Sequence, residues 1–562
     1  MSCKKIVYTL SATAILLSFS SLAPGAELQL WSVDPLVKVF RDAEPQPAGT
    51  AVDHVARGEY GEFQIVVRSD TSLDTLSASV TDFSNAVSGT TIPGASVRFV
   101  GYVHVDRPSQ RPSLDQLRQP PADFPDVLLE DASVSVPSEQ AQPVWISVHV
   151  PPAVPEGAYQ ASVTVRSDSG GITQEATYPL KLVVYPITVD STRLWVTNWF
   201  SMQWRHMEIN PEPDSAAYYD LLRRYARNMA EHRQNAALIS PLALSRFYVN
   251  AEGALAVDFE KFDRWVQIFI DEGVIGRIEG GHIGGRSGGW DSDFITYIHS
   301  VQDGAVTNGS AAPDSEEART FYGFFYPALT AHLKEKGWLD IYMQHLADEP
   351  TQRNMGTYKA LAALVHEFAP ELRIIEANHT KELVGSMDIW VPQLNFFHED
   401  FGHYQERQKN GDEVWFYTCV FPQGEYANRF IELPLIKTRL LHWINFTAAP
   451  QATCTGDTMR GKTKTLGFIQ PVNITDRPIF LPETPGLCIR VKRDPSIPSA
   501  LKPCGTVSLT MSCCAVWQKK ILKRRIGWQQ VIFSILTATI RTLRPFVQHV
   551  LHCCRHWPPL PE

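Results

Sequence analysis

The chain has 562 residues, of which 44% are hydrophobic and 20% charged, so it is a globular protein long enough for two or three domains. Its formal net charge of -9 argues against nucleic acid as a partner. Only Cys419 lies between residues 4 and 446, which excludes a disulfide framework in the main part of the chain.

Residues 1–26 are typical of a secretory signal peptide. Lys4 and Lys5 precede an apolar run that ends in small residues at Gly25 and Ala26. A membrane anchor is the alternative, but the Ser and Thr residues of the run and its small-residue end favour cleavage. We therefore expect a secreted or periplasmic protein with no stable membrane span after cleavage.

Residues 27–188 alternate apolar and polar side chains with a period of two. Segments such as EFQIVVRSD, VWISVHVPP and YQASVTVRS are typical of strands, and Gly, Pro and Asp separate them. The pattern predicts a β-sandwich domain.

From Leu194 onward, short apolar runs alternate with amphipathic helical segments, which predicts a parallel sheet covered by helices. The seven expected strands are 194–200, 236–242, 277–283, 341–347, 373–379, 388–394 and 413–419. We predict a (β/α)8 catalytic barrel over residues 189–446 that has lost its last strand. A doubly wound sheet is the alternative. The Gly- and Ser-rich connection over residues 280–318 is expected to be a mobile active-site loop rather than decoration.

Asp348 and Glu349 lie side by side where one expected strand ends. Adjacent residues are poorly placed to straddle a glycosidic bond, as a two-carboxylate retaining glycosidase requires. They suit a reaction in which the acetamide oxygen of a 2-acetamido sugar attacks the anomeric carbon. One carboxylate would then orient the acetamide N–H, and the other would act as general acid and base.

Polar and aromatic residues gather at the other strand ends and in the segment after the last strand. Aromatic faces stack on pyranose C–H surfaces and amides bond hydroxyl groups, so this collection favours a sugar site. The expected substrate-binding residues are Trp199, Asn378, His379, Gln393, Tyr417 and Arg429. Each also has a structural interpretation, as a core or loop-holding residue.

The segments NWF, HLADEP, IWVPQL and WFYTCVFPQGEYANRFIELPLIKTRLLHWINF resemble the catalytic domain of glycoside hydrolase family 123. The preceding sandwich, with GEYGEFQIVVRSD, resembles the N-terminal domain of that family, and the resemblance spans residues 27–446. It implies a retaining exo-β-N-acetylgalactosaminidase acting on glycans or glycolipids. It also implies Asp348 as the orienting residue and Glu349 as the acid/base.

Two other functions remain open. One is a non-catalytic glycan-binding barrel protein, and the other is a two-carboxylate glycosidase whose nucleophile is Glu376 or Glu279. Neither a cofactor nor a metal is expected.

The resemblance ends after Phe446, where family members continue with an eighth strand such as GATGYLHWGYN. Reading the third base of each codon with the first two of the next lets residues 451–459 encode GYLHWGYN, and residues 504–514 encode RDGVVDYELL. We interpret residues 447–562 as an out-of-frame tail without a specified domain, which also explains its 16 Lys and Arg against 5 Asp and Glu. A redox or metal domain and a membrane-surface tail are the alternatives.

A barrel without its eighth strand would expose the backbone edges of its first and last strands. We therefore expect the chain as written to be poorly soluble and inactive or nearly so.

Overall fold

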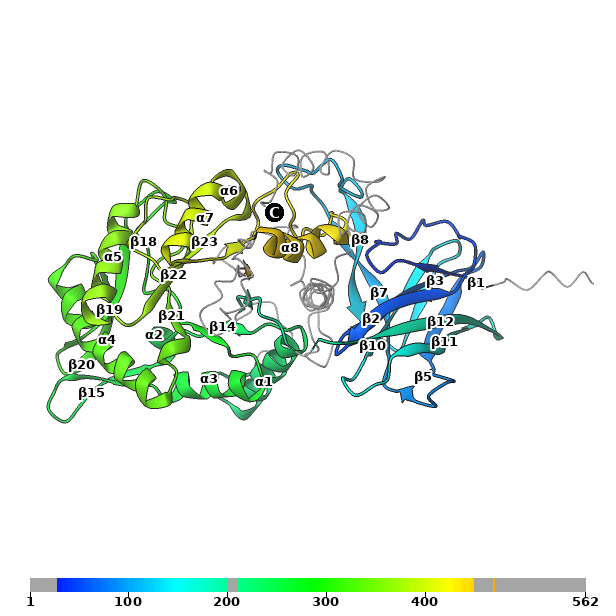
Figure 1. The fold of residues 1–562 in the computed structure, drawn as a ribbon, viewed down its shortest axis with the longest axis horizontal. Coiled ribbons are helices and arrows are strands. Elements are labelled where there is room, and N and C mark those ends of the chain that lie inside the picture. Colours follow the sequence, from blue (N-terminus) through cyan, green and yellow to red (C-terminus); the bar gives the residue numbers. More distant parts are fainter. Residues whose placement is uncertain (1–27, 190, 201, 203–210, 449–467, 471–562) are drawn as a thin grey trace, which may run out of the picture.

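The computed structural model describes residues 28–189, 191–200, 202, 211–448 and 468–470. Figure 1 shows two bodies, an all-strand domain in blue and cyan and a domain of helices and strands in green and yellow. The predicted signal peptide and nearly all of the predicted out-of-frame tail lie outside the described residues. Within the described part, no helix is long and apolar enough to cross a membrane.

The N-terminal domain is built from two sheets that face each other across one core, as the sequence predicts. Its strands are β1 (Gln29–Val33), β2 (Ala51–Arg57), β3 (Tyr60–Arg68), β4 (Leu73–Val80), β5 (Phe83–Ser84), β6 (Thr91–Ile92), β7 (Ser96–Val105), β8 (Ala122–Leu129), β9 (Ser133–Val136), β10 (Gln142–His149), β11 (Gly157–Ser169) and β12 (Ile172–Thr188). The orders are β1-β3-β10-β7-β8 and β2-β12-β11-β4-β9. Alternate residues such as Val163, Val165, Leu180 and Leu182 point into the core because side chains alternate along a strand.

The second domain alternates strands and helices. Its principal strands are β13 (Val196–Asn198), β14 (Ala236–Leu238), β17 (Arg277–Glu279), β21 (Tyr342–Gln344), β22 (Arg373–Asn378), β23 (Ile389–Pro392), β24 (Glu413–Val414) and β25 (Phe416–Tyr417). Its helices are α1 (Ala216–Glu231), α2 (Pro241–Leu244), α3 (Glu260–Asp271), α4 (Glu316–Lys336), η1 (Leu339–Ile341), α5 (Met355–Phe368), α6 (Leu394–Glu399), α7 (Phe401–Asn410) and α8 (Leu435–Ala448). A short hairpin joins β15 (Arg246–Val249) and β16 (Leu255–Asp258).

Six of these strands form one parallel sheet whose order, β14-β17-β21-β22-β23-β24, follows the order of the chain. A doubly wound sheet would reverse its strand order at a switch point, so that alternative is wrong. The strands curl as in a barrel, but the described residues form two separate sheets, of which the second is β13-β26-β25. The regular, continuous barrel that the sequence predicts is therefore only partly present.

The expectation that the last strand is lost needs correction. A short strand, β26 (Phe468–Gln470), pairs in parallel with β13 on one side and β25 on the other. It takes the place between the first and last strands that an eighth strand would occupy. Ladder bonds use main-chain N–H and C=O groups, which every residue other than proline carries, so a segment without the expected side chains still pairs there.

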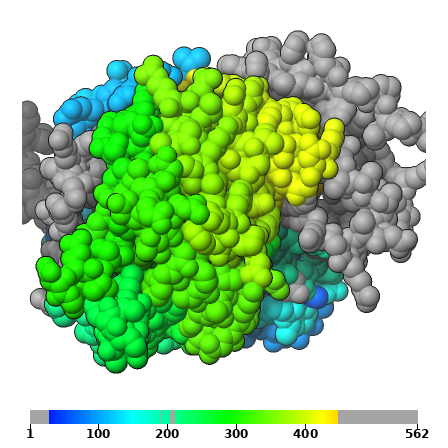
Figure 2. All heavy atoms as spheres, turned by 90° about the vertical axis from the view of Figure 1, so that its left-hand side faces the viewer, coloured from blue at the N-terminus to red at the C-terminus, as the bar shows by residue number. Residues whose placement is uncertain are grey.

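The Gly-rich connection after β17 is mostly regular structure and not a long mobile loop. It forms a three-stranded antiparallel sheet of β18 (Gly284–Arg286), β19 (Phe294–Gln302) and β20 (Ala305–Ala311). Figure 2 views the molecule from the side of α4, α5 and β20, and the green segments make up most of this face.

The two domains are joined by the connection between β7 and β8, residues 106–121, which reaches the yellow segment before α8 (Figure 1). The buried Glu432 carboxylate accepts hydrogen bonds from Ser109 N, at 3.2 Å, and from Gln116 Nε2, at 3.2 Å. The Glu432 carbonyl accepts a further bond from Leu117 N at 2.9 Å. The segment in which the family resemblance is most specific therefore also forms part of the domain interface.

Replacing Glu432 with Ala should destabilise the joined domains by about 2 kcal/mol, because buried donors lose their acceptor. We expect the thermal midpoint to fall by roughly 2–3 °C. The control is Glu130→Ala, which removes an exposed carboxylate paired with Arg98 in the N-terminal domain, away from this interface, and should change the midpoint by about 1 °C or less. Equal midpoints for Glu432→Ala and wild type would contradict this account of the interface.

Candidate active site

Asp348 and Glu349 follow β21 at the edge of the parallel sheet where the strands end. Successive side chains of an extended chain point to opposite faces, so two adjacent carboxyls would ordinarily diverge. The backbone of Glu349 instead has φ of 48°, a left-handed conformation that non-glycine residues rarely adopt. This turn breaks the alternation, so the two carboxyl groups interact electrostatically. Burial, and then the charge of Glu349, raise the pKa of Asp348. Strained backbone of this kind is typical of functional sites.

The strand end that carries the pair is held by Glu376, a fully buried residue of β22. Glu376 Oε2 accepts hydrogen bonds from the backbone N–H groups of Leu346, at 2.8 Å, and Ala347, at 3.0 Å. These are the two residues immediately before Asp348. The carboxylate therefore fixes the direction in which the chain leaves β21.

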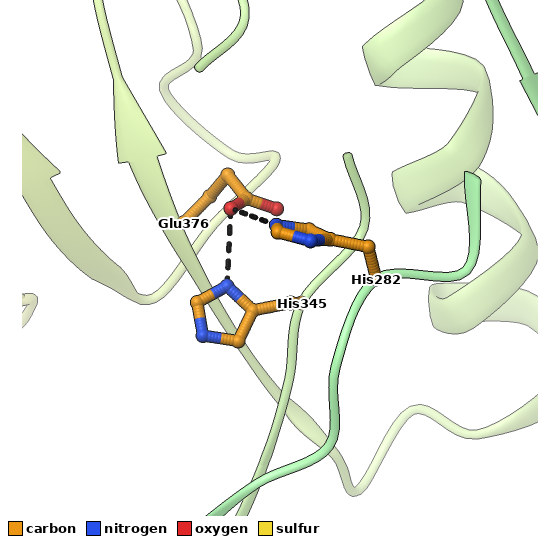
Figure 3. Close-up of side chains that lie close together, drawn as sticks. All are labelled: His282, His345 and Glu376. Carbon is orange, nitrogen blue, oxygen red and sulfur yellow. Dashed lines mark hydrogen bonds and ion pairs between the residues drawn. The ribbon is translucent and has the colours of Figure 1, made fainter. Parts of the chain in front are cut away.

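The other oxygen of Glu376 lies between two imidazole rings (Figure 3). Glu376 Oε1 is 3.0 Å from His345 Nδ1 and 3.1 Å from His282 Nε2. Burial alone would raise the pKa of Glu376, but the two histidines outweigh it and lower that pKa to about 2. His345 also bonds Glu279 through Nε2 at 3.0 Å. Although burial opposes its charge, the adjacent carboxylates raise the pKa of His345 to about 10, so it is a buried imidazolium.

Within the described residues, His282, His345 and Glu376 form the one group whose ligand atoms lie close enough together to suggest a metal site. Their hydrogen bonding does not suit this role. A metal needs a free lone pair on each imidazole, whereas both nitrogens of protonated His345 donate to carboxylates. We interpret the group as an ion-pair network.

Glu349 is surrounded by residues that the sequence analysis predicts for the sugar site. Tyr417 donates its hydroxyl to Glu349 Oε1, and His379 Nε2 lies 3.3 Å from the same oxygen. His379 and Tyr417 also contact each other at 2.8 Å, and Gln393 Nε2 donates to the Tyr417 hydroxyl at 3.3 Å. The structure thus brings together His379, Gln393 and Tyr417 around one of the two carboxyls.

The two carboxyls have opposite pKa shifts. Burial, and then the charge of Glu349, raise the pKa of Asp348 to about 6. Burial acts in the same direction on Glu349, but the hydrogen bond and charge of His379, together with Tyr417, lower its pKa. Asp348 Oδ1 is buried and has no hydrogen-bond partner within the described part of the chain. A buried carboxylate oxygen in this state is a site for an incoming donor.

The other three predicted residues lie near the site but bond within the protein. Trp199 is buried and donates its indole N–H to Glu279 at 2.9 Å. The Asn378 amide donates to Thr380 and Tyr404 and accepts from Val391 N–H, so its polar atoms are fully used in holding loops and strands. Arg429 is buried and donates to Asn198. Substrate contacts by these three residues stay predictions, and for Asn378 the structure favours a structural role.

Two further contributors were not predicted from the sequence. Arg286 donates from Nη2 to the Glu349 carbonyl at 2.9 Å and acts electrostatically on both carboxyls. His345 is the centre of the ion-pair network. The available signal was the presence of His345 and Glu376 inside otherwise apolar strand runs, where an unpaired charge is costly.

Replacing Asp348 with Asn should stabilise the protein at pH 8 and have little effect at pH 4. The folded-state pKa near 6 lies above the ordinary 3.8, so the stabilising contribution of this carboxyl is complete below about pH 4 and is lost as pH rises through 6. We expect the free energy of unfolding of the variant to exceed that of wild type by about 1–2 kcal/mol at pH 8. The thermal midpoints of both proteins, measured at pH 4 and at pH 8, test this.

Asp220→Asn on the exposed face of α1 is the control and should show no such pH-dependent gain. A pH-independent midpoint difference for Asp348→Asn would mean that the pKa of Asp348 is not raised in the folded protein.

Comparison with known proteins assigns both domains to one family. The N-terminal domain model of glycoside hydrolase family 123 matches residues 41–167, and the catalytic domain model of the same family matches residues 199–450. Among curated proteins, a search found no match.

Among solved structures, a family 123 glycoside hydrolase from Clostridium perfringens, described for the hydrolysis of glycolipid glycans, is similar with a TM-score of 0.67. Its sequence identity is 16%, and the alignment covers 88% of this chain and 89% of that chain. A β-glucuronidase from Parabacteroides merdae aligns with a TM-score of 0.25 at 9% identity over 74% of this chain and 45% of its own, which is too low to support an argument. The two domain models and the shared fold show that the chain belongs to glycoside hydrolase family 123.

Proposed function

We propose that the protein removes terminal β-linked N-acetylgalactosamine from glycans or glycolipids, with the acetamide group of the substrate as the nucleophile. The observation that carries the proposal is the buried, unpartnered Asp348 Oδ1 beside the hydrogen-bonded Glu349. An acetamide N–H supplies the donor that this oxygen lacks, and Glu349 is then left to exchange a proton with the glycosidic oxygen. The Clostridium perfringens relative, described for glycolipid glycans, supports the substrate class.

The reaction proceeds in two steps. In the first, Asp348 holds the acetamide N–H, the acetamide oxygen attacks the anomeric carbon, and the glycosidic C–O bond breaks as Glu349 gives its proton to the leaving oxygen. The product is an oxazolinium ion, whose positive charge Asp348 stabilises. In the second, Glu349 takes a proton from water as that water attacks the anomeric carbon and opens the ring, so the β configuration is retained.

The pKa shifts of Asp348 and Glu349 are the reverse of these roles. With the pKa of Asp348 raised and that of Glu349 lowered, the single shared proton of the pair lies on Asp348 before substrate binds. An acetamide N–H that donates to Asp348 favours its charged form, and displacement of water by the glycosidic oxygen disfavours the charge on Glu349. Substrate binding therefore transfers the proton to the residue that needs it.

A two-carboxylate mechanism with Glu376 or Glu279 as nucleophile is disfavoured. Both side chains are fully buried. Both oxygens of Glu376 bond His282, His345 or the backbone before Asp348, whereas Glu279 bonds His345 and Trp199 through Oε2 and its Oε1 has no partner within the described residues. Attack by either one would remove a buried carboxylate from its hydrogen bonds, which is costly.

We also propose that the protein is exported and that its reading frame changes near Thr447. The signal-like residues 1–26 support the first proposal. The second is supported by the end of the catalytic-domain match at residue 450 and by the family-like segments in the shifted frame.

The chain with its frame restored after Phe446, called here the frame-restored chain, should release 4-nitrophenol from the β-N-acetylgalactosaminide. Glu349→Gln and Asp348→Asn should each lower kcat/KM by about 10²–10⁴-fold, since each removes a group that acts in the transition state. The control Glu371→Gln removes an exposed carboxylate paired with Lys334 and should leave the rate unchanged. Activity on the plain β-galactoside equal to that on the acetamido sugar would rule out acetamide participation, and sugar binding without turnover would identify a glycan-binding protein.

The pH profile of the frame-restored chain should fall on its alkaline side. The pair loses its last proton near pH 6, so kcat/KM should decrease about tenfold per pH unit above that value. In Asp348→Asn the remaining proton belongs to Glu349 alone, whose pKa is lowered, and the alkaline limb should move to lower pH. If the alkaline limb of Asp348→Asn lies at the same pH as that of the unsubstituted chain, the proton of the pair does not control the rate.

The chain as written should show at least 100-fold lower activity than the frame-restored chain, because the sugar pocket lacks the aromatic side chains expected from HWGYN. Initial rates of equal amounts of soluble protein, measured side by side, test this. Equal values for both chains would mean that residues 447–562 form a genuine domain.

A further inference from the structure

An aromatic side chain stands exposed beside the candidate acid/base. Trp290 is 50% exposed, which leaves a large aromatic surface open to solvent. It lies in the turn between β18 and β19, residues 287–293, named here the Trp290 turn. The mechanism proposed above does not use this residue.

The Trp290 turn is fixed in place. Arg286 Nε donates to the Trp290 carbonyl at 2.7 Å, and Ser287 N donates to the Asp293 carbonyl at 2.9 Å. Asn354, in the segment that follows the catalytic pair, donates from Nδ2 to the carbonyl of Ser292 at 3.2 Å. A side chain held on such a turn loses little freedom when it binds a ligand.

Two contacts connect the Trp290 ring to Glu349. The Arg286 guanidinium lies 3.9 Å from the centre of the ring, and the same guanidinium donates to the Glu349 carbonyl at 2.9 Å. On another side, the ring centre of His379 is 5.8 Å from that of Trp290, and His379 lies 3.3 Å from Glu349 Oε1. Because Arg286 covers one face of the indole, the exposed surface belongs to the opposite face and the outer edge.

The position of the acid decides which part of a substrate would meet this ring. A general acid must reach the glycosidic oxygen, so the leaving sugar lies on the same side as Glu349. A pyranose presents C–H groups on its flat face, and these are buried favourably against an aromatic surface. Asp291, paired with Arg353 at 3.3 Å, adds polar groups beside the ring for the hydroxyls of that sugar.

We propose that Trp290 is the stacking platform for the first sugar of the leaving group, so that the protein distinguishes glycan chains from simple β-N-acetylgalactosaminides. This inference rests on the proposed function, because it takes Glu349 as the acid. The ligand class is a hexopyranose ring linked through its hydroxyl to the terminal acetamido sugar.

The test compares two non-hydrolysable ligands on the frame-restored chain by calorimetry. One is the methyl thioglycoside of β-N-acetylgalactosamine, and the other is the thio-linked disaccharide with a galactoside in the leaving position. Wild type should bind the disaccharide about tenfold more tightly than the monosaccharide. Trp290→Ala should abolish this gain and leave the monosaccharide Kd within twofold, whereas Trp290→Phe should keep part of it.

Tyr248→Ala is the matched control, since Tyr248 is 37% exposed and also lies beneath an arginine, Arg246, but on the β15–β16 hairpin. It should bind both ligands like wild type. If wild type binds the monosaccharide but binds the disaccharide no more tightly, the role of Trp290 is wrong and the proposed function stands. Equal weakening of both ligands in Trp290→Ala would assign Trp290 to support of the Glu349 loop. If wild type binds neither ligand, both this inference and the proposed function are wrong.

Discussion

The arrangement of the active site depends on one buried carboxylate. Glu376 accepts hydrogen bonds from the N–H groups of Leu346 and Ala347 with one oxygen and contacts His345 and His282 with the other. Burying the negative charge of Glu376 is costly unless both of its oxygens are hydrogen-bonded and a positive charge lies nearby. Both conditions hold here, because His345 is positively charged. These contacts fix the path of the backbone after β21, and Asp348 and Glu349, which has a left-handed backbone conformation, follow directly.

The difference between the two carboxyls follows from this fixed exit. In the described part of the chain, Asp348 Oδ1 is buried and has no hydrogen-bond partner, whereas Glu349 contacts Tyr417 and His379. Two neighbouring acids with the same intrinsic chemistry thereby acquire opposite pKa shifts, which is how a pair of carboxyls is given separate roles. In the mechanism proposed above, the acetamide N–H of the substrate reverses the order of these two pKa values.

Much of this organisation could be predicted from the sequence. Alternating hydrophobicity predicts the sandwich, and each of the seven apolar runs contains a strand, with β24 and β25 both in the last run, because period and burial are local properties. Side chains at strand ends were harder to predict. Tyr417 and His379 do reach Glu349, but Asn378, from a neighbouring strand end, turns its amide into the protein, and the choice depends on neighbours distant in sequence. Arg286 lay within a Gly-rich segment that was expected to be a mobile loop, so its contact with the Glu349 carbonyl could not be foreseen.

The backbone position of β26 has a similar explanation. Pairing with β13 and β25 uses main-chain groups alone, so loss of the expected side chains does not prevent it. Sequence patterns predict side-chain burial and therefore could not indicate this strand. A paired backbone does not replace the aromatic side chains that the proposed sugar pocket requires.

The central claim is that the nucleophile belongs to the substrate. The most direct measurement is the Kd of the thiazoline analogue of N-acetylgalactosamine, a stable mimic of the bicyclic oxazolinium, on the frame-restored chain. The account predicts binding at least about 100-fold tighter than that of N-acetylgalactosamine itself, with most of the gain lost in Asp348→Asn. A thiazoline that binds no more tightly than the free sugar would contradict acetamide participation at this site.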